Sequence, residues 1–476
     1  MKKTKIVCTI GPKTESVEKL TELVNAGMNV MRLNFSHGNF AEHSVRIQNI
    51  RQVSENLNKK IAVLLDTKGP EIRTIKLENG EDVTLTVGQS FTFTTDTSVI
   101  GNKDIVAVTY PGFAKDLNPG AIILVDDGLI EMEVVATTDT EVKCTVLNTG
   151  DLGENKGVNL PNISVGLPAL SEKDKADLAF GCEQEVDFVA ASFIRKADDV
   201  REIREVLFKH GGENIQIISK IENQEGVDNF DEILAESDGI MVARGDLGVE
   251  VPFAKVPLIQ KSLIKQAQDM GKTVVVATQM LDSMVRNPSP TRAEASDIAN
   301  AVFDGADAVM LSNESAAGDH PQEAVQAMAS IAAFANQAPY FMRNQEFYFA
   351  ETPSDEMATE DAISSSAAMI AEQLESRAIV CYTATGSTAR RMSRQRPTTR
   401  IWSFSPDVKV ARALALNYGI SARVIDQIES VDQLMPTATA KAKEFGAAKE
   451  GEKIVITFGS PIGKLGSTNS IRVATV

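Results

Sequence analysis

Two stretches decide the fold: IISKIEN at residues 217–223 and GIMVARGDLGVE at residues 239–250. Each begins as a short apolar run rich in β-branched residues, which is typical of a buried strand, and each ends abruptly in charged residues. In a parallel α/β protein, such strand ends meet at the carboxyl edge of the sheet, where ligands bind. We therefore expect four charged side chains to converge there: Lys220, Glu222, Arg244 and Asp246.

These side chains suit a hard divalent cation that is shared with a phosphorylated substrate. Mg²⁺ takes few protein carboxylates and leaves its other positions to water and phosphate oxygens, and here two carboxylates accompany an ammonium group. A single charged strand end is more often a salt bridge than a site, but two consecutive ones favour a site.

Length, charge and cysteine content limit the class of protein. A chain of 476 residues exceeds what one hydrophobic core supports, so we expect two or three domains. A net charge of −17 disfavours nucleic acid or an anionic membrane as a partner. The cysteines show no CxxC or CxxH spacing, which argues against zinc or a disulfide framework. Without a signal peptide or an apolar run of about 18 residues, the chain is expected to be cytoplasmic.

Strands and helices alternate before residue 70 and again from residue 171 to about residue 335. The expected strands span residues 5–10, 29–35, 61–65, 187–193, 215–221, 239–243, 273–278 and 308–311. Eight strands make a closed (β/α)₈ TIM barrel, to which we assign residues 1–70 and 171–345. Polar residues follow the other strands as well, among them Arg32, Asn34, Ser36, His37, Asp66, Ser192, Thr278 and Glu314.

The remaining residues follow two other patterns. Between residues 74 and 167, short alternating segments are separated by Gly, Asn and Asp turns, without a convincing helix. This predicts an all-β domain inserted at the barrel mouth, which we expect to be a β-barrel lid over residues 71–170. After a weakly patterned stretch at residues 337–355, helices and strands alternate again, which predicts a doubly wound α/β domain over residues 346–476.

A hydroxyl-rich loop in this last domain, TATGST at residues 383–388, separates a strand from a helix expected to begin near Ala389. Hydroxyls and helix N-terminal amides can cradle a phosphate. A helix cap rich in Thr and Ser is equally compatible with the pattern.

Five motifs together resemble the signature segments of pyruvate kinases, most closely the bacterial type I enzymes. They are MRLNFSHG (31–38), LDTKGPEIR (65–73), ISKIEN (218–223), VARGDLG (242–248) and ATQML (277–281). The motifs stand in the family's order, and the resemblance extends over all three domains. It implies transfer of the phosphoryl group of phosphoenolpyruvate to ADP, giving pyruvate and ATP in the final step of glycolysis.

The resemblance also implies a role for each matched residue. Phosphoenolpyruvate would contact Arg32, Lys220, Gly245, Asp246 and Thr278, of which Lys220, Arg32 and Thr278 would be catalytic. Mg²⁺ would be held by Glu222 and Asp246, and K⁺ by Asn34, Ser36, Asp66 and Thr67. The nucleotide would contact Asn34, His37, Arg73 and Lys156. Glu71 matches the residue type of potassium-dependent members, and the family likeness suggests a homotetramer.

The same resemblance implies a regulatory site, and three positions differ from the residues that are usual in the family. It predicts a sugar-phosphate effector, fructose 1,6-bisphosphate, at Thr383, Thr385, Gly386, Ser387 and Thr388. Ser387 stands where activated relatives often have Lys, which leaves Arg390, Arg391 and Lys464 to supply charge. Asn313 replaces a usual glycine, and asparagine tolerates a positive φ better than most residues. Ser289 stands where a basic residue is common.

Two other functions fit part of the pattern. A Mg²⁺-dependent lyase or aldolase acting on pyruvate-like enolates would also use paired carboxylates and a basic group. It would not need the nucleotide-facing residues, so dependence on ADP separates the two enzymes. A metabolite sensor that has lost its chemistry is disfavoured because Lys220, Glu222, Asp246 and Thr278 are all present.

Overall fold

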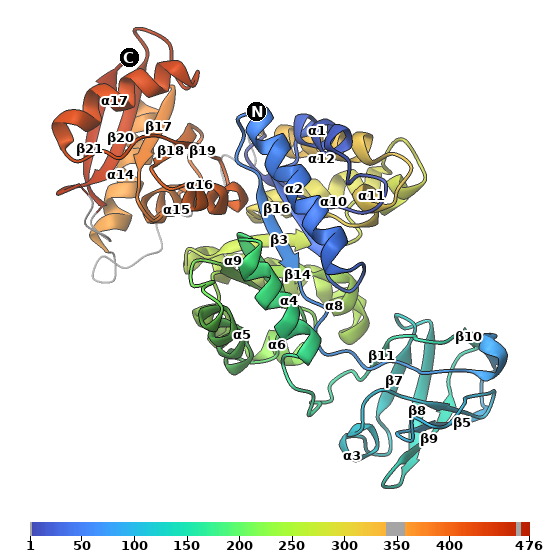
Figure 1. Ribbon diagram of the computed structural model, residues 1–476. Helices are drawn as coiled ribbons and strands as arrows, with labels where there is room; N and C mark the ends of the chain where they lie inside the picture. The colour runs from blue at the N-terminus through green and yellow to red at the C-terminus, as the bar shows by residue number, and fades with distance from the viewer. Residues whose placement is uncertain (1, 339–357, 463–467) are drawn as a thin grey trace.

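The computed structural model describes residues 2–338, 358–462 and 468–476, which form three units. The barrel lies between the other two, with the inserted domain at one end and the C-terminal domain at the other (Figure 1). Most of the weakly patterned stretch at residues 337–355 lies outside the described residues, as does Lys464.

Eight parallel strands close into a barrel in the order β1-β16-β15-β14-β13-β12-β3-β2. They are β1 (Lys5–Thr9), β2 (Val30–Asn34), β3 (Ala62–Asp66), β12 (Phe188–Ala191), β13 (Gln216–Ile221), β14 (Gly239–Ala243), β15 (Thr273–Ala277) and β16 (Ala308–Leu311). The predicted TIM barrel is confirmed, with strand ends that differ from the expected ones by at most two residues.

Helices follow the strands and cover the outside of the barrel. They are α1 (Val17–Ala26), α2 (Phe40–Asn56), α4 (Glu172–Glu183), α5 (Ala197–Lys209), α6 (Gln224–Asp228), α7 (Phe230–Glu236), α8 (Arg244–Glu250), α9 (Val256–Asp269), α10 (Arg292–Asp304), α11 (Asn313–Ala316) and α12 (Pro321–Ala335). A capping box of Ser171 and Asp174 starts α4. The helix α8 was missed, because its seven residues contain two glycines, which have low helix propensity.

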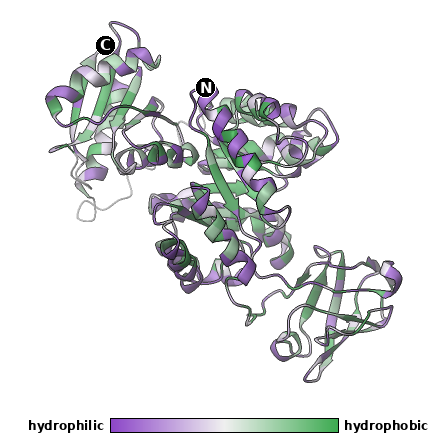
Figure 2. Cartoon of the chain, viewed as in Figure 1, coloured by the Kyte–Doolittle hydropathy of each residue, from purple (hydrophilic) through white to green (hydrophobic). Residues whose placement is uncertain are grey.

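Side chains alternate along the barrel strands between the interior and the surrounding helices. Val30, Leu64 and Ile218 belong to an apolar cluster inside the barrel. Two positions further along the same strands stand Arg32, Asp66 and Lys220, which therefore share the inward face. The barrel interior is apolar toward the amino-terminal ends of the strands and polar at their carboxyl ends, which we call the top of the barrel. Figure 2 shows apolar barrel strands surrounded by helices that carry many hydrophilic residues.

The C-terminal domain closes the bottom of the barrel. Leu416, which is fully buried, and Ala415 belong to the same interior cluster as the strand residues. The Arg412 guanidinium lies 2.8 Å from Asp187, immediately before β12. Asn417 Nδ2 donates to Thr273 Oγ1, 2.8 Å away at the start of β15. The domain is thus docked against the amino-terminal ends of the strands, opposite the polar layer.

Replacing Leu416 with alanine is expected to lower the free energy of unfolding by about 3 kcal/mol, because it leaves a cavity in a closed core. Chemical denaturation measures the loss. Leu258→Ala, at a side chain that is 69% exposed, is the matched control and should change stability by less than about 0.5 kcal/mol. Equal effects of the two substitutions would contradict the role of Leu416 as the floor of the barrel.

The inserted domain contains the strands β4 (Val83–Leu85), β5 (Ser90–Thr94), β6 (Ile105–Ala107), β7 (Ile122–Val125), β8 (Ile130–Thr137), β9 (Glu141–Val146), β10 (Gly150–Leu152) and β11 (Val158–Asn159), and the short helix α3 (Phe113–Asp116). One sheet has the open order β11-β7-β8-β9-β5-β6, and β10 pairs with β4 separately. The all-β character is confirmed, but the expected closed β-barrel is replaced by two sheets. The edge strands β11 and β6 have only two and three residues, too few for a closing ladder.

The C-terminal domain is a five-stranded sheet in the order β19-β18-β17-β20-β21, in which only β21 is antiparallel. Its strands are β17 (Ala378–Tyr382), β18 (Arg400–Ser405), β19 (Ile420–Val424), β20 (Lys453–Gly459) and β21 (Thr468–Thr475). Its helices are α14 (Thr359–Gln373), α15 (Ser387–Arg394), α16 (Val408–Ala413) and α17 (Val431–Glu444). The predicted α/β domain is confirmed.

Candidate active site

A chain of ion pairs crosses the polar top layer of the barrel. Arg32 Nε lies 2.6 Å from Asp66 Oδ2, and Lys220 Nζ lies 3.1 Å from Asp66 Oδ1 and 2.9 Å from Glu222 Oε1. Ser192 Oγ accepts a further hydrogen bond from Lys220, 2.7 Å away. Residues from four strand ends are therefore held in one network, which includes Lys220 and Glu222 but not the other two side chains expected to converge, Arg244 and Asp246.

Burial and charge together set the protonation of this network. Burial would lower the pKa of Lys220, but Asp66 and Glu222 outweigh it and raise that pKa above its usual range. Burial would raise the pKa of Asp66, but Arg32 and Lys220 lower it instead. Lys220 therefore stays a cation at neutral pH, and Asp66 stays an anion.

Glu222 and Asp246 form a carboxylate pair that suits a metal ion. Phe193 N–H donates to Glu222 Oε2 at 2.6 Å, but the buried Oε1 makes no hydrogen bond and has only the Lys220 ammonium nearby. Burial raises the pKa of Glu222 to about 7, against the pull of Lys220 and with support from Asp246. The Asp246 carboxylate makes no hydrogen bond or ion pair with any described residue. Two neighbouring carboxylates with oxygen atoms that accept no hydrogen bond would suit a cation that prefers oxygen ligands.

Thr278 is held in a strained conformation beside Gly245. Its φ is 69°, which is rare for a β-branched residue, and such strain often accompanies function. Thr278 Oγ1 accepts from Gly245 N–H at 2.8 Å, so the two predicted substrate contacts adjoin. Arg244 points elsewhere than we expected: it pairs with Asp297 at 2.7 Å and donates to the Thr278 carbonyl at 2.8 Å. It positions Thr278 and does not join the charged network.

The four residues predicted to hold K⁺ lie on adjacent strands. Asn34 and Asp66 are direct partners in the β2–β3 ladder, and Ser36 N–H donates to Asn34 Oδ1 at 3.0 Å. Thr67 follows Asp66 directly, and its hydroxyl accepts from Ser192 N–H at 3.1 Å. The four residues of the predicted set therefore lie at the ends of the paired strands β2 and β3.

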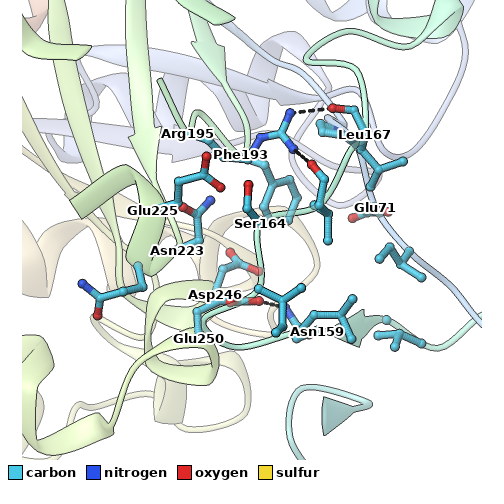
Figure 3. Close-up of a pocket in the computed structure, with 18 of the residues that line it drawn as sticks. Glu71, Asn159, Ser164, Leu167, Phe193, Arg195, Asn223, Glu225, Asp246 and Glu250 are labelled. Atoms are coloured by element: carbon cyan, nitrogen blue, oxygen red, sulfur yellow. Dashed lines mark hydrogen bonds between the residues drawn. The ribbon is translucent and has the colours of Figure 1, made fainter. Parts of the chain in front are cut away.

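A cavity of about 660 Å³ opens between the barrel and the inserted domain. Its wall includes Glu71, Arg73, Asp126, Asp127, Lys156 and Asp246. Figure 3 shows Asp246 and Glu250 on the barrel side, with a hydrogen bond from Asn159 of the inserted domain to Glu250. The predicted nucleotide contacts are split, since Arg73 and Lys156 line this cavity whereas Asn34 and His37 do not.

Arg195 attaches to the barrel the second connector, the segment around residues 160–170 that leads from the inserted domain back into the barrel. Its two terminal nitrogens donate to the carbonyls of Val165 and Leu167, both at 2.7 Å (Figure 3). Its own backbone is fixed, because its N–H donates to Asp199 and its carbonyl accepts from Asn229. The side chain is buried, so these charge-assisted bonds are shielded from water.

The inserted domain also forms hydrogen bonds with this second connector. Gly166 N–H donates to Tyr110 Oη at 2.9 Å and to Asp116 Oδ2 at 3.1 Å. The first connector is equally close to the barrel, since a Cβ on Gly69 would meet the Ser192 Cβ at 2.8 Å, and Gly69 has a φ of 72°. The inserted domain is therefore joined to the barrel by two connectors. The first packs against the barrel at Gly69, and the second is bound by Arg195.

Arg195→Gln is expected to raise the rate of thermolysin cleavage in the second connector, on the amino-terminal side of Ile163 or Val165, about tenfold, because the segment loses its charged anchor and opens more often. The measurement is limited proteolysis followed by mass spectrometry. Arg201→Gln, at an exposed arginine of the adjoining helix α5, serves as the control and should cleave as the native chain does. Equal protection in both variants would contradict the anchor.

The predicted effector loop leads directly into α15, which starts at Ser387, two residues earlier than expected. Gly386 has a φ of 85° and donates its N–H to Thr383 Oγ1 at 2.9 Å. Thr385 is exposed, while Thr388 is buried and shares a hydrogen bond with Thr468. Arg391 pairs with Asp361 at 2.6 Å, so it does not supply free charge; Arg390 remains at the loop.

Some relevant residues were missed or misjudged. Thr9, whose hydroxyl accepts from Arg32 Nη1 at 2.8 Å, stands at a strand end and could have been found by the same pattern. Asp127 and Arg195 lie in loops and carry no such signal. Asn313 begins α11 and does not adopt a positive φ, so its substitution for glycine brings no backbone strain. Ser289 is exposed.

Comparison with known proteins agrees over the whole chain. The family model described as pyruvate kinase, barrel domain, matches residues 1–325, and the one described as pyruvate kinase, alpha/beta domain, matches residues 361–474. A curated pyruvate kinase of Clostridium acetobutylicum is 50% identical over 476 residues and is covered, like this chain, to 100%.

Two further similarities support the same assignment. A pyruvate kinase of Bacillus licheniformis is 51% identical over 478 residues, which cover 100% of this chain and 81% of that protein. The crystal structure of a pyruvate kinase from Cryptosporidium parvum superposes with a TM-score of 0.95 and 39% identity, over 100% of this chain and 96% of that one.

Proposed function

Since the chain belongs to the pyruvate kinase family and is therefore a phosphotransferase, we propose that it transfers the phosphoryl group of phosphoenolpyruvate to ADP with Mg²⁺ and K⁺ as cofactors. The observation that carries this proposal is the network of Arg32, Asp66, Lys220 and Glu222, next to the unpaired Asp246. It combines two fixed cations with two carboxylates that lack full partners.

Arg32 and Lys220 would bind the phosphate of the substrate. Arg32 Nη2 makes no hydrogen bond to any described residue, although Nε and Nη1 are fixed by Asp66 and Thr9. This leaves one nitrogen of a rigid guanidinium for a phosphate oxygen. The N–H groups at the start of α8, at Gly245 and Asp246, and the Thr278 hydroxyl would position the rest of the molecule.

Phosphoryl transfer needs charge stabilisation more than proton transfer on the enzyme. The bond from phosphorus to the enolate oxygen breaks, a new bond forms to an oxygen of the ADP β-phosphate, and the enolate carbon then gains a proton. Lys220, held protonated by its carboxylate neighbours, would stabilise the moving phosphoryl group without losing its own proton. Thr278, with water, would deliver the proton to carbon.

Glu222 and Asp246 would hold Mg²⁺, which when bound supplies positive charge to the enolate, carboxylate and phosphoryl oxygens. Asn34, Ser36, Asp66 and Thr67 would hold K⁺, and Glu71, which matches the residue type of potassium-dependent members, supports that proposal. Arg73, Lys156, His37 and Asn34 would contact the nucleotide, so Asn34 and His37 would need to approach the cavity when the inserted domain closes.

The remaining parts of the proposal concern regulation and assembly. A sugar phosphate, fructose 1,6-bisphosphate, would bind at the 383–388 loop, where Gly386 has a φ of 85° and Arg390 supplies charge. The enzyme would act in the cytoplasm as a homotetramer, as the family likeness suggests. No helix among the described residues is long and apolar enough to span a membrane.

The test is pyruvate formation from phosphoenolpyruvate and ADP, with Mg²⁺, K⁺ and fructose 1,6-bisphosphate each added or withheld. We expect turnover only with ADP and both cations, and a lower half-saturating concentration of phosphoenolpyruvate with the sugar bisphosphate. Na⁺ at equal ionic strength controls for salt. Full turnover without K⁺, or an unchanged saturation curve, would refute the corresponding part of the proposal.

A further inference from the structure

A second cavity, of about 570 Å³, lies at the other end of the barrel, between the start of the chain, the end of α12 and one edge of the C-terminal domain. Five cations stand on its wall: Lys2, Lys3, Lys5, Arg377 and Arg400. Hydroxyl and amide groups complete its lining, at Asn336, Gln337, Ser376, Thr398, Thr399 and Ser421. Its size is that of a site for a small metabolite.

Four of these five cations are held in place without a carboxylate partner. Arg377 lies 4.0 Å from the Glu452 carboxylate, whereas Lys2, Lys3, Lys5 and Arg400 form no ion pair with a carboxylate among the described residues. The lysine ammonium groups donate to neutral oxygens instead: Gly27 O and Asn29 Oδ1 for Lys2, Pro397 O for Lys3, and Ile420 O for Lys5. Glu375 lines the wall without pairing, and Glu372 accepts hydrogen bonds from Thr398. The wall therefore keeps an excess of positive charge in a chain whose net charge is −17.

Trp402, the only tryptophan of the chain, lies in this wall with two guanidinium groups close to its ring. The guanidinium carbons of Arg400 and Arg423 are 5.4 and 5.1 Å from its ring centre. The indole holds both cations through its ring face, which contributes no negative charge. Arg423, like Arg400, has no carboxylate partner in the described part of the chain.

Charge that is buried and not cancelled is costly. Burial lowers the pKa of Lys2 and of Lys5 to about 7, and neighbouring cations, Arg400 among them, add to the effect. An anion in the cavity would remove this cost. A phosphate monoester carries a charge of about −1.5 to −2 at neutral pH and offers three acceptor oxygens, whereas a carboxylate offers a single charge. Several cations with surrounding hydroxyls match the phosphate better.

We propose that this cavity binds a small phosphorylated metabolite, whose phosphate lies among Lys2, Lys3 and Arg400 beside Trp402. The site is distinct from the 383–388 loop and does not depend on the proposed catalytic function. Since it joins the start of β1 to the C-terminal domain, an occupied site would tie the two domains together at Lys5 and Ile420.

Trp402 provides the test, because it is the only indole that can report on the cavity. Its emission is followed while inorganic phosphate or a hexose 6-phosphate is added at constant ionic strength, with succinate as the carboxylate probe. We expect a saturable change with both phosphates and a response to succinate at least tenfold weaker. Arg400→Gln or Lys3→Gln should weaken the phosphate response at least tenfold; having both variants covers the case in which one fails to fold.

Two controls locate the response. Lys443→Gln, at an exposed lysine of α17 that pairs with Glu450, should bind phosphate as the native chain does. Ser387→Glu places a negative charge in the 383–388 loop and should leave the Trp402 response intact. The proposal is overturned by a linear response, by equal binding in Arg400→Gln and Lys3→Gln, by succinate binding as tight as phosphate, or by loss of the response in Ser387→Glu.

Discussion

Lys220→Met is expected to lower turnover by a factor of roughly 10³ or more, because it removes a positive charge fixed beside the phosphoryl group. Methionine retains most of the volume of the lysine stem, so the packing against the barrel interior is preserved. Steady-state kinetics with saturating phosphoenolpyruvate and ADP measure kcat. The structure supplies the physical reason: Asp66 and Glu222 hold the Lys220 ammonium at 3.1 and 2.9 Å and keep it charged.

The same substitution should leave the barrel folded. Asp66 retains its ion pair with Arg32 at 2.6 Å, and Glu222, whose pKa is already raised to about 7, can take up a proton when its cationic neighbour is lost. The loss in free energy of unfolding should therefore stay below the roughly 3–5 kcal/mol that is typical when one partner of a buried ion pair is removed. Lys261→Met, at an exposed lysine paired with Asp304, is the control. Turnover within tenfold of the native value would exclude Lys220 as the catalytic cation.

Asp246→Asn should separate activity from stability. Without this carboxylate, kcat is expected to fall by a factor of about 10² and half-saturation by Mg²⁺ to require at least tenfold more metal, because one of two anionic ligands is lost. Stability should remain equal or rise, since Asp246 has no partner among the described residues and raises the pKa of both Glu222 and Asp127. Active sites commonly carry such unfavourable charge.

Magnesium titrations of turnover and thermal unfolding in the presence of a chelator give the two readouts. Asp228→Asn is the matched control, because Asp228 lines the same cavity and accepts a hydrogen bond from Gln224. It should leave the magnesium titration unchanged. A loss of both activity and stability in Asp246→Asn would indicate a structural carboxylate and not a metal ligand.

The positions of most strands, and their polar ends, could be predicted because both signals are local. A run of β-branched residues that ends in charge needs no knowledge of the remainder of the chain. Short elements escaped the same approach: α8 has seven residues with two glycines, and β11 has two residues. Such segments form because their neighbours hold them, not because their own residues favour the conformation.

The sequence by itself determined the barrel, the α/β domain, the all-β insertion and four site residues, namely Arg32, Asp66, Lys220 and Glu222. It could do so because the alternation of side chains along a strand and the polar residues at its end are both visible in consecutive residues. Only the tertiary structure decided that these four side chains pair, that Arg244 turns to Asp297, that Arg195 anchors the inserted domain and that Leu416 closes the barrel floor. These contacts join residues far apart in the chain, where no periodic pattern records the partner.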